Sequence, residues 1–105
     1  MIEDNSSSSD PFFDKYVQLA EEKDSQYEIE AHEIIKLGKF SKQIGKLKIT
    51  FQVNGDERSF EIVDPAKPEE VLAGNYGPVG KNEEDLVFEL KSYLAQSEAI
   101  ALSLI

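Results

Sequence analysis

The chain has 105 residues and no cysteine, with 21 acidic against 11 basic side chains and a formal net charge of −10. A chain of this length can bury a modest core without metal or disulfide bonds, and the lack of cysteine excludes a disulfide framework and a thiol nucleophile. The charge disfavours direct binding to nucleic acid, because phosphate contacts dominate such affinity, and favours attraction to a basic partner protein.

The charge is unevenly distributed. Residues 1–35 carry a net −8, residues 36–55 carry five lysines and no acid, and residues 56–105 carry a net −7. The lysines can bind an anionic group, or they can be solvated positions that keep an edge strand from pairing wrongly, and we prefer the second interpretation. This basic island consists of Lys36, Lys39, Lys42, Lys46 and Lys48.

The chain has no basic region followed by an apolar core of the secretory type, and no apolar run approaches membrane-spanning length. We therefore expect a cytoplasmic protein that does not bind membranes. Residues 1–9 are acidic and rich in serine, which is typical of a flexible tail. Residues 10–105 are expected to form a single domain.

A first helix is predicted over residues 10–23. Asp10 can cap its amide groups, and Pro11 suits the first helical position, where a missing N–H costs nothing. Apolar residues recur at helical spacing and form one broad face, and we assign this face to the core. It consists of Phe12, Phe13, Tyr16, Val17, Leu19 and Ala20.

Residues 27–37 are ambiguous. Apolar residues at odd positions alternate with polar ones, which favours a strand, but Glu33 interrupts the alternation and the Glu-rich composition leaves a helix as the alternative. Residues 38–45 are expected to be a basic connector, with Phe40 against the sheet.

Residues 46–64 predict a β-hairpin. Apolar side chains alternate with polar ones on both sides of Asn54 and Gly55, a pair that suits a two-residue type I′ turn. Such a turn places Ile49 opposite Phe60. A four-residue loop would keep the same buried face but change the partners, so the faces are more firmly predicted than the register.

The last third of the chain predicts two helices. A short one is expected over residues 68–73, closed by Gly74, followed by a loop over residues 75–80. Asn82 then caps a long helix whose first turn is acidic, as the helix dipole favours. At about 100° per residue, Phe88 lies opposite the apolar stripe of this helix.

No catalytic set assembles from the sequence. His32 is the only histidine, no zinc-binding spacing is present, and we expect His32 at the surface. Residues 74–81 resemble a phosphate-binding loop in composition only, because the glycine spacing, the residue after Lys81 and the preceding element do not fit. We therefore expect no cofactor, no metal and no enzymatic activity.

The expected layout resembles that of double-stranded-RNA-binding domains, which is helix, three strands, helix. Those domains carry a lysine cluster at the start of their last helix, whereas residues 81–85 here read Lys-Asn-Glu-Glu-Asp, so RNA binding does not carry over. The layout is also similar to that of some small acidic phage-encoded inhibitors, including certain anti-CRISPR proteins that occupy a DNA-binding groove with carboxylates. No motif links the chain to either group, and we assign it to no family.

The sequence thus predicts an α+β fold in two layers, with a three-stranded antiparallel sheet packed on helices in the order α-β-β-β-α-α. We expect a non-enzymatic inhibitor, immunity or accessory protein that docks carboxylates on a basic partner protein, of which a nucleic-acid-binding protein is one kind. The alternatives are an assembly subunit that oligomerises through Phe88 and the apolar C-terminus, and a small enzyme or ligand-binding domain with a pocket that the sequence alone does not show, near Tyr76, His32 and nearby carboxylates. The expected contact residues are Glu69, Glu70, Tyr76, Glu83, Glu84, Asp85 and Phe88.

Overall fold

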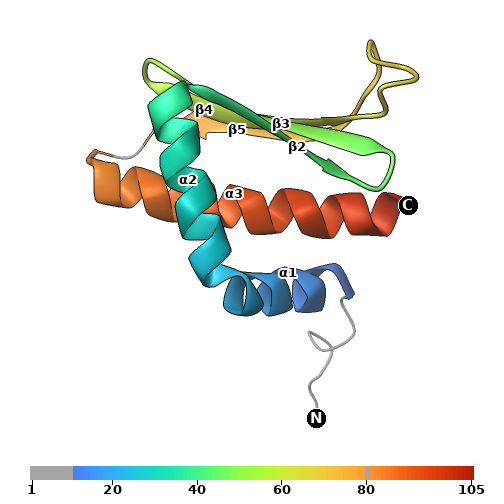
Figure 1. Ribbon diagram of the computed structural model, residues 1–105, viewed down its shortest axis with the longest axis horizontal. Helices are drawn as coiled ribbons and strands as arrows, with labels where there is room; N and C mark the ends of the chain where they lie inside the picture. The colour runs from blue at the N-terminus through green and yellow to red at the C-terminus, as the bar shows by residue number, and fades with distance from the viewer. Residues whose placement is uncertain (1–10, 80) are drawn as a thin grey trace.

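The computed structural model describes residues 11–79 and 81–105. Two helices come first, α1 (Pro11–Glu22) and α2 (Asp24–Leu37), followed by four strands and a long helix, α3 (Glu83–Leu104). The strands are β2 (Lys39–Ile44), β3 (Leu47–Asn54), β4 (Glu57–Val63) and β5 (Val71–Pro78). They form one antiparallel sheet in the order β2-β3-β4-β5, and the helices lie on one face of it (Figure 1). The predicted α+β class is confirmed.

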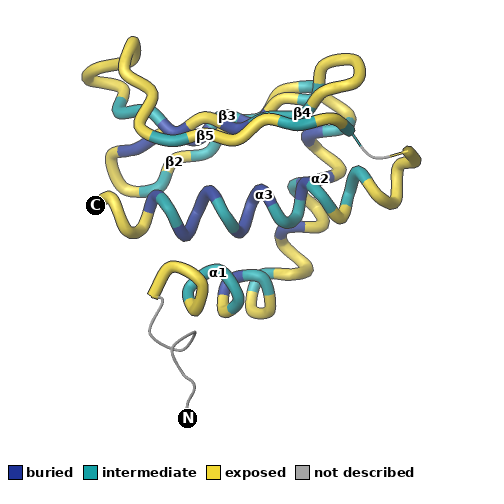
Figure 2. Tube along the Cα trace, turned by 180° about the vertical axis from the view of Figure 1, so that it is seen from behind, coloured by how far each residue is buried: buried dark blue, intermediate teal, exposed yellow. Residues whose placement is uncertain are grey.

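α3 forms the middle layer of the molecule. It lies between the sheet and α1, and α2 crosses beside it from the level of α1 to the sheet (Figure 1). Its buried side chains therefore point in more than one direction. Leu94 lies on the apolar stripe that the sequence predicts, whereas Ala95 lies on the opposite side of the helix, the side of Phe88, and is also buried. Figure 2 shows buried residues concentrated along α3 and in the central strands.

Residues 27–37 form a helix, so the preferred strand was wrong and the alternative was right. The buried side chains of α2 are Tyr27, Ala31 and Ile34, which recur at helical spacing. Ile29, which a strand would have placed inside, is 61% exposed. Gly38 ends the helix in the left-handed conformation, with φ of 76°, and its N–H donates to the carbonyl of Ile34, as is usual at helix C-termini.

Residues 38–45 are not a connector, because residues 39–44 form the edge strand β2. Phe40 pairs with Phe51 and Ile44 pairs with Leu47 on the helix side of the sheet. Lys42 lies between them on the same face and also points to the helices. A lysine therefore interrupts the apolar alternation that would have predicted a strand here. The described sheet consequently has four strands where three were expected.

The central hairpin is confirmed, with the register of the alternative loop. Phe51 pairs with Phe60, and Ile49 pairs with Ile62. The turn lies at Gly55 and the following residue, one position later than predicted, with φ of 62° at Gly55. The buried faces are unchanged, because a two-residue shift in register preserves the side on which each residue lies.

Residues 71–78 form the strand β5, so the predicted short helix and most of the predicted loop were wrong. Two successive turns connect β4 to this strand: the N–H of Lys67 donates to the carbonyl of Asp64, and the N–H of Glu70 donates to that of Lys67. Gly74 does not close a helix. It lies so close to β4 that an added Cβ would be 2.9 Å from the carbonyl oxygen of Phe60.

The first and last helices are found as predicted. The side chain of Asn82 accepts a hydrogen bond of 2.8 Å from the N–H of Asp85, which confirms the cap. The expected cap at Asp10 and the tail of residues 1–9 lie outside the described residues. Leu19 is buried, but Phe12 and Phe13 are exposed, so assigning them to the core was wrong. α1 packs mainly against α3, through a face that includes Tyr16, whose hydroxyl is hydrogen-bonded to Ser92.

With two helices before four strands, the layout no longer matches helix, three strands, helix, and the resemblance to double-stranded-RNA-binding domains loses its basis. None of the described helices has both the length and the apolar composition needed to cross a membrane.

Candidate functional site

A groove runs along the N-terminal half of α3, on the side away from the sheet. The α3 residues that line it form adjacent pairs that recur every four positions, so they share one face of the helix. A hollow of about 420 Å³ forms where α2 crosses this face. It is lined by Glu28, His32, Glu83, Glu84, Val87, Phe88 and Lys91.

A second, smaller hollow of about 180 Å³ continues the groove toward α1. Tyr16 and Ala20 of α1 form one wall, and Phe88 and Lys91 line both hollows. Phe88 is 74% exposed. The groove therefore presents a large aromatic ring between two concave surfaces, an arrangement typical of a site that accepts apolar groups from a partner.

The charges of the groove are predominantly negative. Lys91 lies 2.7 Å from a carboxylate oxygen of Asp24 and 3.5 Å from one of Glu28. The hydrogen bond to Asp24 raises the pKa of Lys91 above its usual value, although burial opposes the shift. Because Asp24 and Glu28 already form ion pairs with Lys91, the carboxylates of Glu83 and Glu84 are the ones that a cationic group of a partner would meet.

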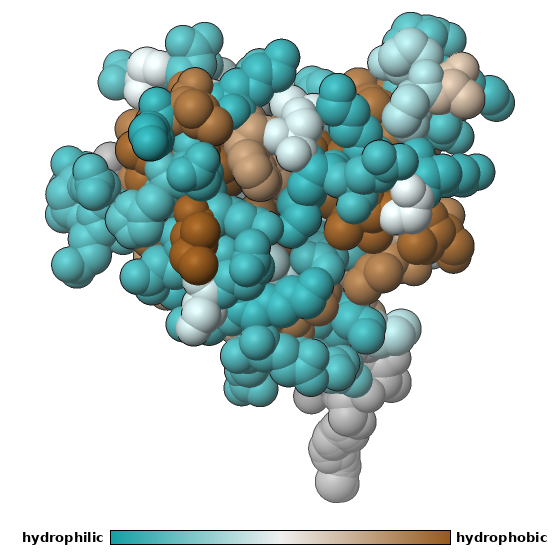
Figure 3. All heavy atoms as spheres, in the orientation of Figure 1, coloured by the Kyte–Doolittle hydropathy of each residue, from teal (hydrophilic) through white to brown (hydrophobic). Residues whose placement is uncertain are grey.

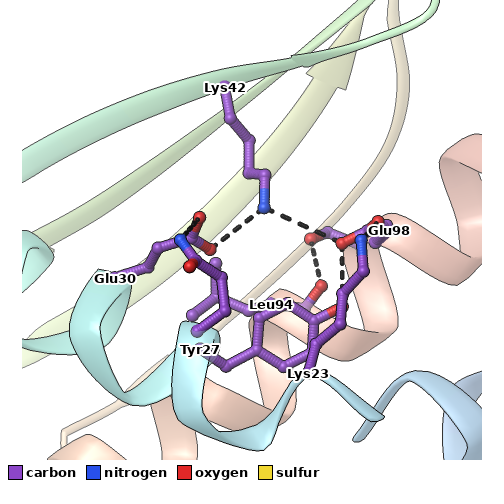
Figure 4. Close-up of polar contacts among 8 residues, drawn as sticks. Lys23, Tyr27, Glu30, Lys42, Leu94 and Glu98 are labelled. Carbon is purple, nitrogen blue, oxygen red and sulfur yellow. Dashed lines mark hydrogen bonds and ion pairs between the residues drawn. The ribbon is translucent and has the colours of Figure 1, made fainter.

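A buried polar cluster fixes α2 against α3 and so determines the shape of the groove (Figure 4). Glu98, only 4% exposed, accepts a 2.7 Å hydrogen bond from the hydroxyl of Tyr27 and a 2.6 Å hydrogen bond from Lys23. Lys42 of β2 lies 3.0 Å from Glu30 and 3.7 Å from Glu98. Two ammonium groups thus meet two carboxylates, which is the condition for burying such charges.

The cluster shifts two pKa values in opposite directions. Burial raises the pKa of the Tyr27 hydroxyl strongly, and the hydrogen bond to Glu98 raises it further. Burial also acts to raise the pKa of Glu98, but the hydrogen bonds from Lys23 and Tyr27, together with the charges of Lys42 and Lys23, outweigh it and lower the pKa. Glu98 is therefore ionised and Tyr27 neutral near pH 7.

The structure brings together only part of the predicted contact surface. Glu83, Glu84 and Phe88 line the same hollow, and Asp85 lies in the same helical turn but does not line it. The other predicted residues lie elsewhere. Glu69 and Glu70 are on the connection from β4 to β5, and Tyr76 is on β5, where its hydroxyl donates to Glu57.

The predicted pocket near Tyr76 and His32 does not assemble, because these residues line separate hollows. His32 is exposed, as expected. Within residues 11–79 and 81–105, no group of three or more acidic, histidine or cysteine side chains could hold a metal ion.

Four residues of the larger hollow were missing from the predicted contact surface: Glu28, His32, Val87 and Lys91. Glu28 and His32 are four residues apart, so they share a face in a helix and in a strand alike. The preferred strand hid instead that this segment is a helix that lies beside Phe88 of α3. The basic island is also divided: Lys42 belongs to the buried cluster, whereas Lys36, Lys39, Lys46 and Lys48 are exposed on different elements.

Comparison with known proteins gives no match: no family model matches the chain, and no significant match is found among curated proteins or solved structures. The residues of the groove and their geometry are therefore the basis on which a function can be assigned.

Proposed function

We propose that this protein is a small acidic protein-interaction module of the inhibitor, immunity or accessory type, which binds a basic partner protein through the groove between α2 and α3. The observation that carries the proposal is the exposure of Phe88 at 74%, beside the carboxylates of Glu83 and Glu84. The net charge of −10 supports it, because a basic protein is attracted to the whole molecule.

Phe88 is expected to be the central contact of the interface. Transferring a phenylalanine side chain out of water contributes about 1.5–3 kcal/mol, and aromatic residues next to hollows are typical sites of concentrated binding energy. The surrounding carboxylates act mainly on the rate of association and on the choice of partner. A partner whose surface is apolar but carries no basic residues would therefore gain nothing from these carboxylates in association rate or specificity.

The partner that best fits this chemistry presents arginine or lysine side chains around a small apolar protrusion. An arginine can stack on the face of Phe88 while its guanidinium group binds Glu83 or Glu84. Proteins that bind nucleic acid offer such surfaces, because they carry clustered basic residues.

The test is a comparison of the proteins retained from a native lysate by the tagged wild-type chain and by variants. A specific partner should be lost with Phe88→Ala and with the pair Glu83→Gln and Glu84→Gln. It should be kept by the matched pair Glu69→Gln and Glu70→Gln, which removes the same charge at the other end of the molecule. Binding should also weaken at high salt, because salt screens exposed charges.

Purified partner and variants then give dissociation constants. Phe88→Ala should weaken binding by at least about tenfold, as expected for a central aromatic contact. Circular dichroism of each variant controls for folding. A partner whose affinity is the same for Phe88→Ala and wild type would contradict the proposal.

A further inference from the structure

A second exposed apolar surface lies at the other end of α3. Leu72, Leu104 and Ile105 are all exposed. Leu72 and Leu104 line one hollow of about 230 Å³, with Leu47 also in its wall. Figure 3 shows apolar side chains gathered where α3 ends, beside a surface that is otherwise mainly hydrophilic.

The three residues belong to one continuous surface, which we call the end patch. Ile105 lies over the turn between β2 and β3, because a Cβ added to Gly45 would be 3.2 Å from its Cδ1 atom. Leu72 reaches the same region from the start of β5. The end patch therefore joins the last residues of α3, the β2–β3 turn and the first residues of β5.

Unlike the groove, the end patch is electrically balanced. Its hollow is lined by two lysines, Lys46 and Lys67, and two acids, Asp64 and Glu70. Lys46 and Asp64 lie 3.8 Å apart. A basic partner is therefore not selectively attracted here, whereas another chain of net charge −10 can approach this end without facing a local excess of negative charge.

The charges are also arranged so that the patch can match itself. Lys67 and Glu70 stand at the two ends of one turn, closed by a 3.0 Å hydrogen bond from the N–H of Glu70 to the carbonyl of Lys67. In a two-fold symmetric contact, if residue i of the first copy faces residue j of the second, then residue j of the first copy also faces residue i of the second. Lys67 of each copy can therefore face Glu70 of its partner around an apolar centre.

We propose that a second copy of this chain binds at the end patch and forms a two-fold symmetric dimer. Phe88 is not part of this interface, because α3 advances about 24 Å between residues 88 and 104. The homo-oligomer expected from Phe88 and the C-terminus together is thus reduced to one built from the C-terminal end of α3. The patch is small, so the dimer is weak and depends on concentration.

Sedimentation velocity of the wild-type chain tests the proposal, over concentrations from about 10 μM to about 1 mM. The expected result is a dimer fraction that rises with concentration at constant salt. A monomer at every concentration would overturn the proposal.

Variants then locate the interface. Leu104→Asp should weaken the dimer by at least about tenfold, because the substitution occurs twice in a symmetric interface. Phe88→Asp, the same kind of change at a more exposed residue toward the opposite end of α3, should leave the dimer intact. Equal weakening by both variants would contradict the assignment to the end patch.

A charge exchange tests the symmetry itself. Lys67→Glu and Glu70→Lys should each weaken the dimer several-fold, since each produces two like-charge contacts. The double variant should recover wild-type association, because the exchange restores both opposite-charge pairs. Failure of the double variant to recover would refute the two-fold pairing of these residues.

Discussion

Glu98→Gln removes one negative charge from the buried cluster while keeping nearly the same shape. Glu98 is bound by Lys23 at 2.6 Å and by the hydroxyl of Tyr27 at 2.7 Å, and Lys42 lies 3.7 Å away. After the substitution the amide oxygen can still accept from Tyr27, but the two lysines lose a common counter-charge. We expect the folded state to be destabilised.

The size of the effect follows from the exposure of each partner. Removing one member of a fully buried ion pair costs about 3–5 kcal/mol. The side chain of Lys23 is 43% exposed, so water replaces part of its lost interaction, and Lys42 keeps Glu30 at 3.0 Å. The expected loss is therefore about 2 kcal/mol of the free energy of unfolding.

Urea denaturation followed by far-UV circular dichroism measures this difference. The matched control is Glu84→Gln, which removes an exposed charge from the first turn of the same helix and should cost less than about 1 kcal/mol. A loss below about 0.5 kcal/mol for Glu98→Gln near pH 7 would refute the reasoning, because it would equate a buried and an exposed carboxylate.

The same comparison has a defined pH dependence. Because the pKa of Glu98 is lowered in the folded state, its charge stabilises the protein above the pKa of the unfolded carboxyl. That stabilisation is lost as the pH falls through the lower folded pKa. The difference in the free energy of unfolding between wild type and Glu98→Gln should therefore become smaller as the pH is lowered from about 7 to about 3. A gap that stays constant would show that the charge is not its source.

Three further predictions concern the fold. Because the pKa of Tyr27 is raised in the folded state, its neutral hydroxyl contributes fully to stability below the usual tyrosine pKa, and this contribution is lost as the pH rises beyond it. Ultraviolet titration should therefore show that one of the four tyrosines ionises only when the protein unfolds. The Tyr27→Phe variant should lack this late ionisation. Gly74→Ala should cost about 1–3 kcal/mol by urea denaturation, because its Cβ would approach β4 to 2.9 Å; no loss would contradict this close contact. Ile34→Ala should cost about 2–4 kcal/mol, whereas Ile29→Ala should be nearly neutral, and the reverse order would favour a strand over α2.

The central hairpin could be predicted because its faces depend only on local alternation. Leu47, Ile49 and Phe51 have no second pattern to compete with the period of two. Its register could not be predicted, because turns one position apart bury the same residues and the choice depends on the neighbouring strands. The pairing of Phe51 with both Phe40 and Phe60 is information that a single hairpin does not contain.

Two errors arose where a local pattern was compatible with more than one structure. Tyr27 and Ala31 are four residues apart, which satisfies both a strand of period two and a helix, and the helix-ending Gly38 would have favoured the helix. In β2, Lys42 occupies an inward position because Glu30 and Glu98 neutralise it. Its acidic partners come from distant segments, so the sequence could not identify it as an inward residue.

The candidate site was predicted only where it depends on one helix. The periodicity of α3 correctly placed Phe88 away from the sheet, and Glu83 and Glu84 followed from the acidic first turn. The other wall of the groove depends on α2, which was assigned to a strand, so Glu28 and His32 were not associated with Phe88. Tyr76, Glu69 and Glu70 were grouped with them by charge and exposure alone, without a topology to bring them together.

The place of α3 in the chain bears on how the protein is made. It is the most C-terminal described element, yet it forms the layer between the sheet and α1 (Figure 1). During synthesis, the four strands therefore emerge from the ribosome before the helix that covers their apolar face. Until α3 is complete, Phe60 and Ile62 of β4 lack the helix that packs on their strand, and during this period the nascent protein is most exposed to aggregation.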